Sequence, residues 1–224
     1  MKGFIILGLS ASSVLSAQTD STQIKEIQEV SFTRRLPVSK EIINVQKDLG
    51  SKNLGQDLPI LLKNQMSVVA TSDAGNGVGY TGFRIRGSAG TSINVMLNGV
   101  PYNDSESQGT FFVNIPDMAS SASQIVIQRG VGTSSNGTAS FGASVNILTK
   151  NPDEKPYVLG QFSAGSFNTM KTYFEAGSGK FLNNLLSVSA RYSTINSDGY
   201  IDRAFSKLNS YSINALFEKG NTKI

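Results

Sequence analysis

The sequence predicts an α+β domain followed by the first strands of a transmembrane antiparallel β-barrel. Gly, Ser and Asn make up about a third of the 224 residues, and charged residues only 16%, a composition that favours turns and short strands over long helices. Between Pro37 and Lys150, the sequence predicts one leucine-rich helical segment and several short strands. After Pro152, apolar and polar residues alternate with period two in segments near ten residues long, as in a barrel wall.

The composition excludes most kinds of enzyme. The chain has no Cys, His or Trp, so disulfides, Cys/His zinc sites and Cys or His catalysis are absent from it. Its Asp and Glu residues show no paired arrangement, and we therefore expect no enzyme, no cofactor and no metal site. The net charge is +4, with no basic run beyond Arg34 and Arg35, which argues against a nucleic-acid partner.

The N-terminus has the pattern of a secretory signal. Met1 and Lys2 give a positive start, the apolar stretch Phe4–Leu15 follows, and Ser16 and Ala17 form a small-residue cleavage site. A membrane anchor is the alternative, but a spanning helix needs about 20 apolar residues, which this stretch does not supply. We expect residues 1–17 to be a cleaved signal peptide and the mature protein to be exported.

Residues 18–36 are polar apart from one short extended patch, Ile27–Thr33. Val30 and Phe32 favour an extended backbone, and the sequence before Pro37 prevents the patch from growing into a longer element. The patch is predicted to be a tethered, strand-ready peptide. The alternative is that it forms the first strand of the following domain.

Between Pro37 and Lys150, a helix is predicted where leucines recur at helical spacing after Asp57 and Pro59, two residues that suit a first turn. A second short helix is predicted over 116–121. The helical leucines are Leu54, Leu58, Leu61 and Leu62, and the predicted strands are Phe83–Arg86, Ile93–Leu97, Ile125–Gln128 and Ser144–Leu148. Asn98–Gly99 is a dipeptide typical of a type I′ turn, so a tight hairpin is expected there.

Four segments after Asn151 show the barrel-like alternation, the first more weakly: Val158–Ala164, Met170–Ala176, Leu186–Ser193 and Tyr211–Glu218. A soluble antiparallel sheet gives the same alternation, and the export signal favours the barrel. Gly165–Asn168 is predicted to be a short connection, Gly177–Asn184 a turn, and Ser197–Lys207 a longer loop. If the first strand runs outward, the longer loop lies on the outside.

Four motifs occur in a characteristic order: Phe83–Gly87, Val95–Tyr102, Ile125–Gly130 and Gly137–Lys150. Together they resemble the plug domain of TonB-dependent outer-membrane receptors. The resemblance extends back to Ile27–Thr33, which is similar to the family's TonB box in position and in its Glu-Val-x-x-Thr ending. It implies a 22-stranded barrel whose lumen is blocked by the N-terminal plug, in the cell outer membrane of a Gram-negative bacterium.

The resemblance implies four parts: 1–17, the signal peptide; 18–36, a periplasmic TonB-box segment; 37–152, the plug; and 153–224, the first four strands of an incomplete barrel. Four strands cannot close a barrel, because the smallest need about eight. Since 22 strands with their turns would need roughly 350 residues, the chain is expected to be the N-terminal part of a longer receptor.

The function implied is energised uptake of a scarce nutrient of the siderophore-iron, cobalamin or oligosaccharide class. The implied partners are the TonB protein of the inner membrane, outer-membrane lipid and the small extracellular nutrient. The alternatives are a non-transporting binding or signalling receptor, a non-functional truncated fragment, and a secreted soluble enzyme, for which no catalytic constellation is present.

Two sets of contact residues follow from the resemblance. The TonB-binding segment would offer its backbone to an edge strand of TonB, and consists of Ile27, Gln28, Glu29, Val30, Ser31, Phe32 and Thr33. Arg86 and Arg129 fall on family arginines that pair with barrel-wall carboxylates and latch the plug. The alternative is that both are ordinary strand arginines.

Three plug loops are candidates for facing the substrate, the alternative being that they are mere connections. Their residues are Gly75, Asn76, Gly77, Tyr80, Asp104, Ser105, Glu106, Ser135 and Asn136. The glycine-rich stretch 75–79 is not a phosphate-binding loop, because no helix pattern follows it. It is predicted to lie at the outer end of the plug.

Overall fold

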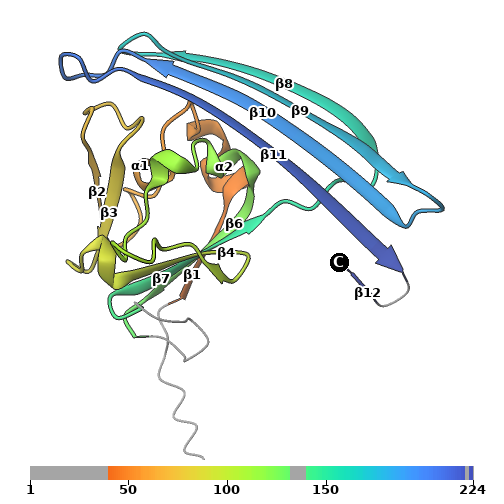
Figure 1. Cartoon of the computed structure of the whole chain (residues 1–224), viewed down its shortest axis with the longest axis horizontal. Coiled ribbons are helices and arrows are strands. Elements are labelled where there is room, and N and C mark those ends of the chain that lie inside the picture. The colour runs from red at the N-terminus through yellow and green to blue at the C-terminus, as the bar shows by residue number, and fades with distance from the viewer. Residues whose placement is uncertain (1–39, 132–139, 220–221, 224) are drawn as a thin grey trace, which may run out of the picture. The chain divides into compact units, whose positions relative to one another are not determined.

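The computed structural model describes residues 40–131, 140–219 and 222–223 (Figure 1). The predicted signal peptide, the predicted TonB-binding segment Ile27–Thr33, and Ser135 and Asn136 lie outside the described residues. Residues 36–224 form one compact unit. Within it, a small α+β domain built from β1 to β7 is followed by a sheet of long strands, called here the wall sheet (Figure 1).

The small domain is organised around a mixed sheet with the strand order β1-β6-β7-β4-β5. Its strands are β1 (Lys40–Asn44), β4 (Ile93–Leu97), β5 (Val100–Pro101), β6 (Ala122–Arg129) and β7 (Ala143–Thr149). Only the β4–β7 pair is parallel. Asn98 and Gly99 have φ values of 52° and 83°, which confirms the predicted tight turn between β4 and β5.

Short helices and one further hairpin complete the domain. The hairpin consists of β2 (Val68–Ser72) and β3 (Thr81–Ile85). The helices are the π-helix η1 (Val45–Leu49), the 3₁₀ helices η2 (Gly50–Lys52), η3 (Gly90–Ser92) and η4 (Phe112–Asn114), and the α-helices α1 (Leu58–Leu61) and α2 (Met118–Ser121). Among the described residues, no helix is long and apolar enough to span a membrane.

The core lies between the sheet and the helices. Alternate residues of three neighbouring strands are buried, because successive side chains of a strand point to opposite faces. These residues are Ile93, Val95, Ile125, Ile127, Val145 and Ile147. Leu49 and Leu62 cover them from the helices, and the rings of Phe83 and Phe112 meet at a centroid distance of 5.3 Å. Each fully buried side chain of this size contributes about 1.5–3 kcal/mol.

The first α-helix begins later than the leucine spacing predicts. It starts at Leu58, with Asp57 as its N-cap and Pro59 in its first turn, whereas Leu54 is exposed outside it. Gly55 explains the difference, because its φ of 118° is one that residues with a side chain rarely adopt and that a helix does not allow. The chain therefore turns at Gly55, close to the wall sheet, before the helix begins. The second predicted helix is present as α2.

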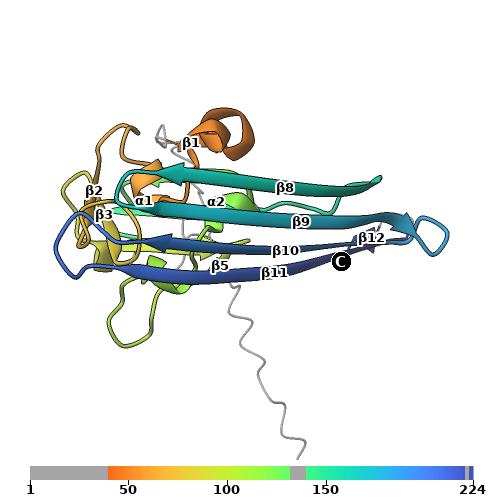
Figure 2. The same ribbon diagram turned by 90° about the horizontal axis from the view of Figure 1, so that it is seen from above.

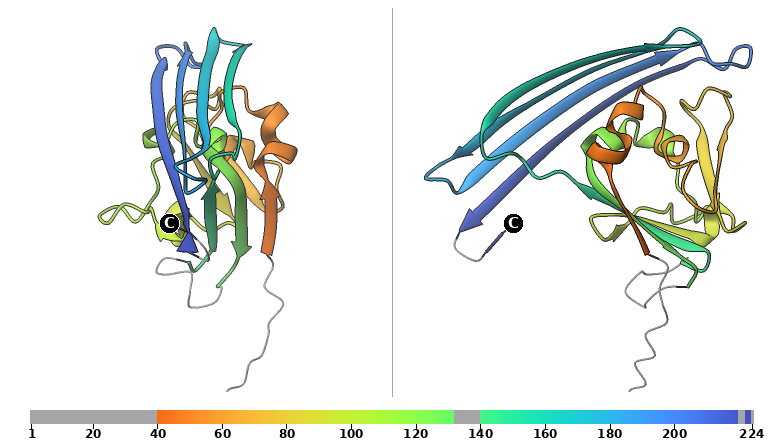
Figure 3. Two further views of the ribbon diagram at one scale, coloured as in Figure 1. Left: turned by 90° about the vertical axis from the view of Figure 1, so that its right-hand side faces the viewer. Right: turned by 180° about the vertical axis from the view of Figure 1, so that it is seen from behind.

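The wall sheet is entirely antiparallel, and its strands lie side by side (Figure 2). Its members are β8 (Pro156–Gly165), β9 (Thr169–Phe181), β10 (Leu186–Ser197), β11 (Ser206–Lys219) and β12 (Thr222–Lys223). The first four contain 10 to 14 residues, enough for a tilted strand to cross a bilayer. The sheet curves over the small domain (Figure 3).

The wall sheet has the polarity expected of a barrel wall. Its buried face is polar and carries Lys171, Tyr173, Glu175, Ser187, Ser189, Arg191 and Ser193. Its other face exposes apolar side chains, including Phe162, Phe174, Tyr211 and Ile213, the last two being 82% and 75% exposed. A soluble sheet would bury the apolar face instead. The alternation is therefore that of a wall with lipid outside and a polar filling inside.

The prediction of a turn over Gly177–Asn184 is wrong in its first half. β9 continues to Phe181, and the turn is formed by Leu182, Asn183 and Asn184, all with positive φ. Gly177 lies within the strand. The position requires glycine because a side chain there would come within 2.2 Å of the Tyr157 ring. This glycine makes room for an aromatic neighbour on β8, which sequence reasoning cannot distinguish from a turn glycine.

The exposed apolar face leads to a first prediction. Without detergent, the complete 224-residue chain should aggregate, because neither this face nor the open sheet edges have partners. In detergent micelles, which cover the apolar face, the same chain should remain in solution. Analytical ultracentrifugation in the two buffers checks this, and a soluble, monodisperse chain in detergent-free buffer would contradict the barrel-wall assignment.

Candidate functional site

The most deeply buried charges of the described residues lie where the small domain meets the wall sheet. Asp117, the N-cap of α2, has a fully buried side chain. Its Oδ1 lies 2.6 Å from Nζ of Lys171 on β9, and its Oδ2 lies 3.2 Å from a guanidinium nitrogen of Arg191 on β10. One carboxylate of the small domain thus binds two cations of the wall. These three residues are called the Asp117 latch.

Neighbouring polar groups complete the hydrogen bonding of Lys171. Besides Asp117, its Nζ donates to Asn53 Oδ1 at 3.2 Å and to Ser120 Oγ at 3.0 Å, so all three ammonium protons have acceptors. The Asn53 amide in turn donates to Ser120 Oγ at 2.9 Å. The fully buried ammonium is thus held by groups that lie on the small domain.

Arg191 is held mainly by hydroxyl groups of the wall itself. It donates to Ser193 at 3.2 Å on its own strand and to Ser210 at 2.9 Å on β11. Its Nε lies 3.4 Å from Ser212 Oγ. The contact with Asp117 involves one guanidinium nitrogen and is not bidentate.

The latch fixes position more than it adds stability. Taking charges out of water costs about as much as a buried pair returns, whereas removing one partner leaves an uncompensated charge and costs about 3–5 kcal/mol. The small domain can therefore bind the wall only where Asp117 meets Lys171 and Arg191. The backbone at Asp117 has a positive φ of 53°, which is uncommon for a residue other than glycine.

The Asp117 latch is a different contact from the one that the family resemblance implies. Arginines of the plug were expected to pair with wall carboxylates, but here the carboxylate belongs to the small domain and the cations to the wall. Sequence reasoning missed it because Asp117 resembles an ordinary helix cap. The available signal was the presence of Lys171 and Arg191 on the polar face of predicted strands.

The two arginines singled out from the sequence lie within the small domain. Arg129 is buried, forms an ion pair with Glu41 of β1, and donates from Nε to the Met66 carbonyl at 3.0 Å. Arg86 is exposed, and its guanidinium lies close to Gly130, the residue after Arg129. A contact of either arginine with a barrel wall stays a prediction.

The predicted outer loop packs against connections of the wall sheet. Asn76 donates from Nδ2 to Ser197 Oγ at 2.5 Å, and the Tyr200 amide donates to the Ala74 carbonyl at 2.9 Å. Gly75 has a φ of 74°, and a side chain there would come within 3.0 Å of Tyr200, so a glycine favours this approach. Gly77 is buried nearby, and Tyr80 is 62% exposed.

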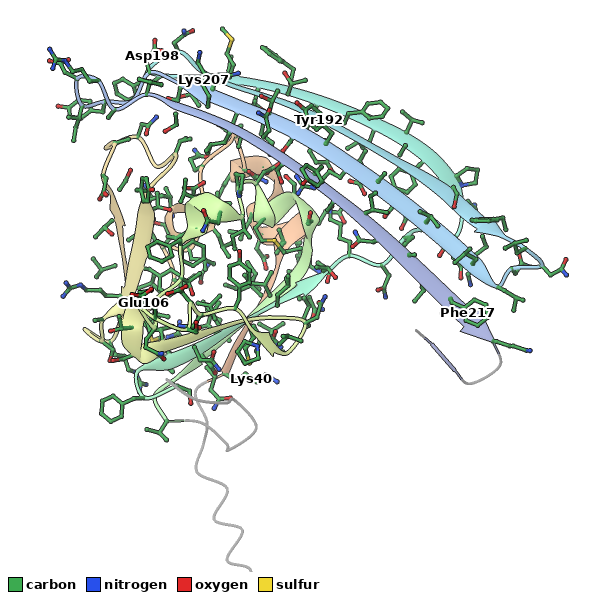
Figure 4. The ribbon with its side chains drawn as sticks, viewed as in Figure 1. Lys40, Glu106, Tyr192, Asp198, Lys207 and Phe217 are labelled. Carbon is green, nitrogen blue, oxygen red and sulfur yellow. The ribbon has the colours of Figure 1, made fainter. Side chains whose placement is uncertain are left out.

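The second candidate loop lies elsewhere on the small domain. Figure 4 shows Glu106 well separated from Asp198 and Lys207 at the end of β10 and the start of β11. The loop is ordered by Asp104, whose carboxylate accepts from the Ser107 amide at 2.7 Å and the Glu106 amide at 3.1 Å. The hydrogen bond from the Ser107 N–H lowers the pKa of Asp104. Ser105 is also exposed here, and the two loops do not form one site.

Asp57 ties the outer loop to α1. Its backbone N–H donates to the Gly77 carbonyl at 2.9 Å, and its Oδ2 accepts from the Thr81 hydroxyl at 2.9 Å. Its Oδ1 is buried and has no hydrogen-bond partner among the described residues. Burial raises the pKa of the Asp57 carboxyl to about 7. Sequence reasoning identified this residue only as part of a helix start.

Comparison with known families agrees with this architecture. Residues 33–144, half of the chain, match the model of the TonB-dependent Receptor Plug Domain. The chain therefore belongs to the TonB-dependent receptors, a family whose members lie in the outer membrane, and its small domain is a plug. No curated protein matches the chain by sequence.

Solved receptor structures share the fold. FpvA of P. aeruginosa bound to pyoverdines aligns with a TM-score of 0.66 at 15% identity, over 84% of this chain and 24% of FpvA. The ferric yersiniabactin uptake receptor FyuA of Yersinia pestis aligns at 0.58 and 14% identity, over 80% and 29%. The copper transporter OprC aligns at 0.61 and 13% identity, over 81% and 28%. The chain thus spans about a quarter of the length of these receptors.

The latch yields a second prediction. Asp117→Asn should lower the free energy of unfolding in detergent by about 3–5 kcal/mol, because Lys171 and Arg191 lose their carboxylate while remaining buried. Asp198→Asn, at an exposed position after β10, is the matched control and should change it by less than about 0.5 kcal/mol. If denaturant titrations gave the same change in the free energy of unfolding for both variants, the prediction that the latch stabilises the fold would be contradicted.

Asp57 yields a third prediction, concerning pH. Its pKa is raised from 3.8 to about 7 in the folded chain, so folding binds a proton that the unfolded chain releases near pH 4. Stability should therefore fall as the pH rises from about 4 to about 7, by about 4 kcal/mol at most, and then level off. Asp57→Asn should remove this part of the pH profile, and an unchanged profile would contradict the assignment.

Proposed function

We propose that the chain is the N-terminal part of a receptor that takes up a scarce nutrient across the outer membrane with energy delivered by TonB. The observation that carries the proposal is a plug bound by buried charges to a wall with a polar inner and an apolar outer face. Such a plug blocks a pore and must be displaced for transport. Residues 1–17 would be the cleaved signal peptide, 37–152 the plug and 153–224 the first wall strands.

The energy for displacement must come from outside this membrane, because the outer membrane has no ATP and no ion gradient of its own. Ile27–Thr33 would be the TonB-binding segment, offering an extended backbone to an edge strand of TonB. This segment precedes β1, which is an edge strand of the plug sheet held by β6 and by the Glu41–Arg129 ion pair. A pull on the N-terminal segment would act first on this strand.

The nutrient would belong to the siderophore-iron, cobalamin or oligosaccharide class. Two of the similar solved proteins are a receptor bound to pyoverdines and a ferric yersiniabactin receptor, which supports the first class. The outer loop Gly75–Tyr80 would be one substrate-facing surface, since it packs against wall connections at one end of the sheet. The loops around Asp104 and around Ser135 and Asn136 would be further candidates.

The TonB-binding segment gives a fourth prediction. Val30→Pro removes a backbone donor from the segment and should abolish energised uptake by the complete receptor without weakening substrate binding. Val30→Ala keeps the donor and should transport normally. Uptake of radiolabelled nutrient and binding to whole cells are measured side by side. Uptake by the proline variant at the wild-type rate would exclude Ile27–Thr33 as the site of TonB binding.

A further inference from the structure

A cavity of about 610 Å³ lies between the plug and the inner face of the wall sheet. The wall side is formed by β10 and β11, and the plug side by α2, the residues before it, and the β4–β5 turn. Among the described residues, those that line it include no Asp or Glu, and Arg191 is the one charged residue among them. The proposed transport function does not by itself explain why the charge of this cavity lining is positive.

Arg191 is only partly neutralised by its neighbours. The short contact of Asp117 goes to Lys171 at 2.6 Å, and Arg191 receives the longer one at 3.2 Å. Charge-assisted hydrogen bonds usually measure about 2.7–2.9 Å. The other three bonds of Arg191 go to uncharged hydroxyl groups. Because one carboxylate, Asp117, faces the two cations Lys171 and Arg191, the cluster has a net positive charge, and Arg191 is its member that lines the cavity.

The rest of the lining consists largely of uncharged hydrogen-bonding groups. β11 contributes Ser210, Ser212 and Asn214 from alternate positions on its inner face. The plug contributes Asn98 and Asn114 from the opposite side. Hydroxyl and amide groups around an arginine are the donors that bind carboxylate and phosphate groups.

A second cavity, of about 510 Å³, has the opposite character and is lined by Glu175, Asp153 and Lys150. Glu175 is in register with Arg191 on the neighbouring strand. Its carboxylate nevertheless accepts from the Tyr173 hydroxyl and, at 2.6 Å, from the Tyr157 hydroxyl, rather than from Arg191. The charged lining of the first cavity is thus basic, whereas that of the second cavity holds two carboxylates and one ammonium group.

We propose that the Arg191 cavity is an oxyanion-binding site, which holds a carboxylate or phosphate group of the nutrient as it passes between plug and wall. The proposal deepens the proposed transport function and rests on it for the identity of the ligand. The binding chemistry itself depends only on Arg191 and the donors around it. It can therefore be tested without transport.

The absence of cysteine from the sequence allows a direct test in detergent micelles. Asn214→Cys places a single thiol in the Arg191 cavity, and Gln46→Cys places one in the Glu175 cavity as the matched control. Each is reacted with an anionic sulfonatoethyl and a cationic trimethylammonioethyl methanethiosulfonate. The ratio of anionic to cationic rates should be at least about fivefold higher for N214C than for Q46C, because opposite local charges attract opposite reagents.

Two variants test whether Arg191 causes the higher ratio of anionic to cationic reaction rates. R191Q in the N214C background should reduce the ratio to that of the control, and S212D, which adds a carboxylate beside the guanidinium, should do the same if R191Q does not fold. Inorganic phosphate should slow the anionic reagent at N214C more than an equal ionic strength of chloride. Equal ratios in the two cavities, or a ratio unchanged by either variant, would overturn the proposal. A receptor that fails to transport but passes this test would refute only the proposed function.

Discussion

The structure depends on one buried contact, the pairing of Asp117 with Lys171 and Arg191. Both cations lie on the inner face of the wall sheet and the carboxylate lies at the start of α2, so each buried charge needs a partner of opposite charge. Because an unpaired buried charge is so costly, the plug and the wall have one favourable arrangement. Asn53 and Ser120 complete the hydrogen bonds that make this arrangement specific.

The polarity of the wall sheet follows from the same constraint. Its inner face needs polar groups that can bind the plug or water, and its outer face needs groups that tolerate lipid. Polar side chains are therefore buried and apolar side chains exposed, the reverse of a soluble sheet. A hydrogen-bonded boundary with cavities can also be loosened locally, whereas a close-packed apolar boundary would resist displacement. The Arg191 and Glu175 cavities lie along this boundary.

The sequence predicted much of the fold, because periodicity and turn chemistry are local. The period-two alternation located the wall strands, and Asn98–Gly99 located the hairpin. The latch could not be predicted in the same way, since Asp117 meets partners that are 54 and 74 residues away along the chain. Gly177 was misassigned for a related reason: its role is to admit a ring from a neighbouring strand, and only the folded sheet brings the two together.

A double-mutant cycle measures whether a carboxylate of the plug holds the plug to the wall. Asp117→Asn, Lys171→Met and the double variant are compared in detergent by the free energy of unfolding. If the ion pair is real, Lys171→Met should rescue part of the loss in the Asp117→Asn background, making the double variant more stable than Asp117→Asn alone by about 1 kcal/mol or more. Losses that add within about 0.5 kcal/mol would show that the two residues are not coupled and would contradict the account.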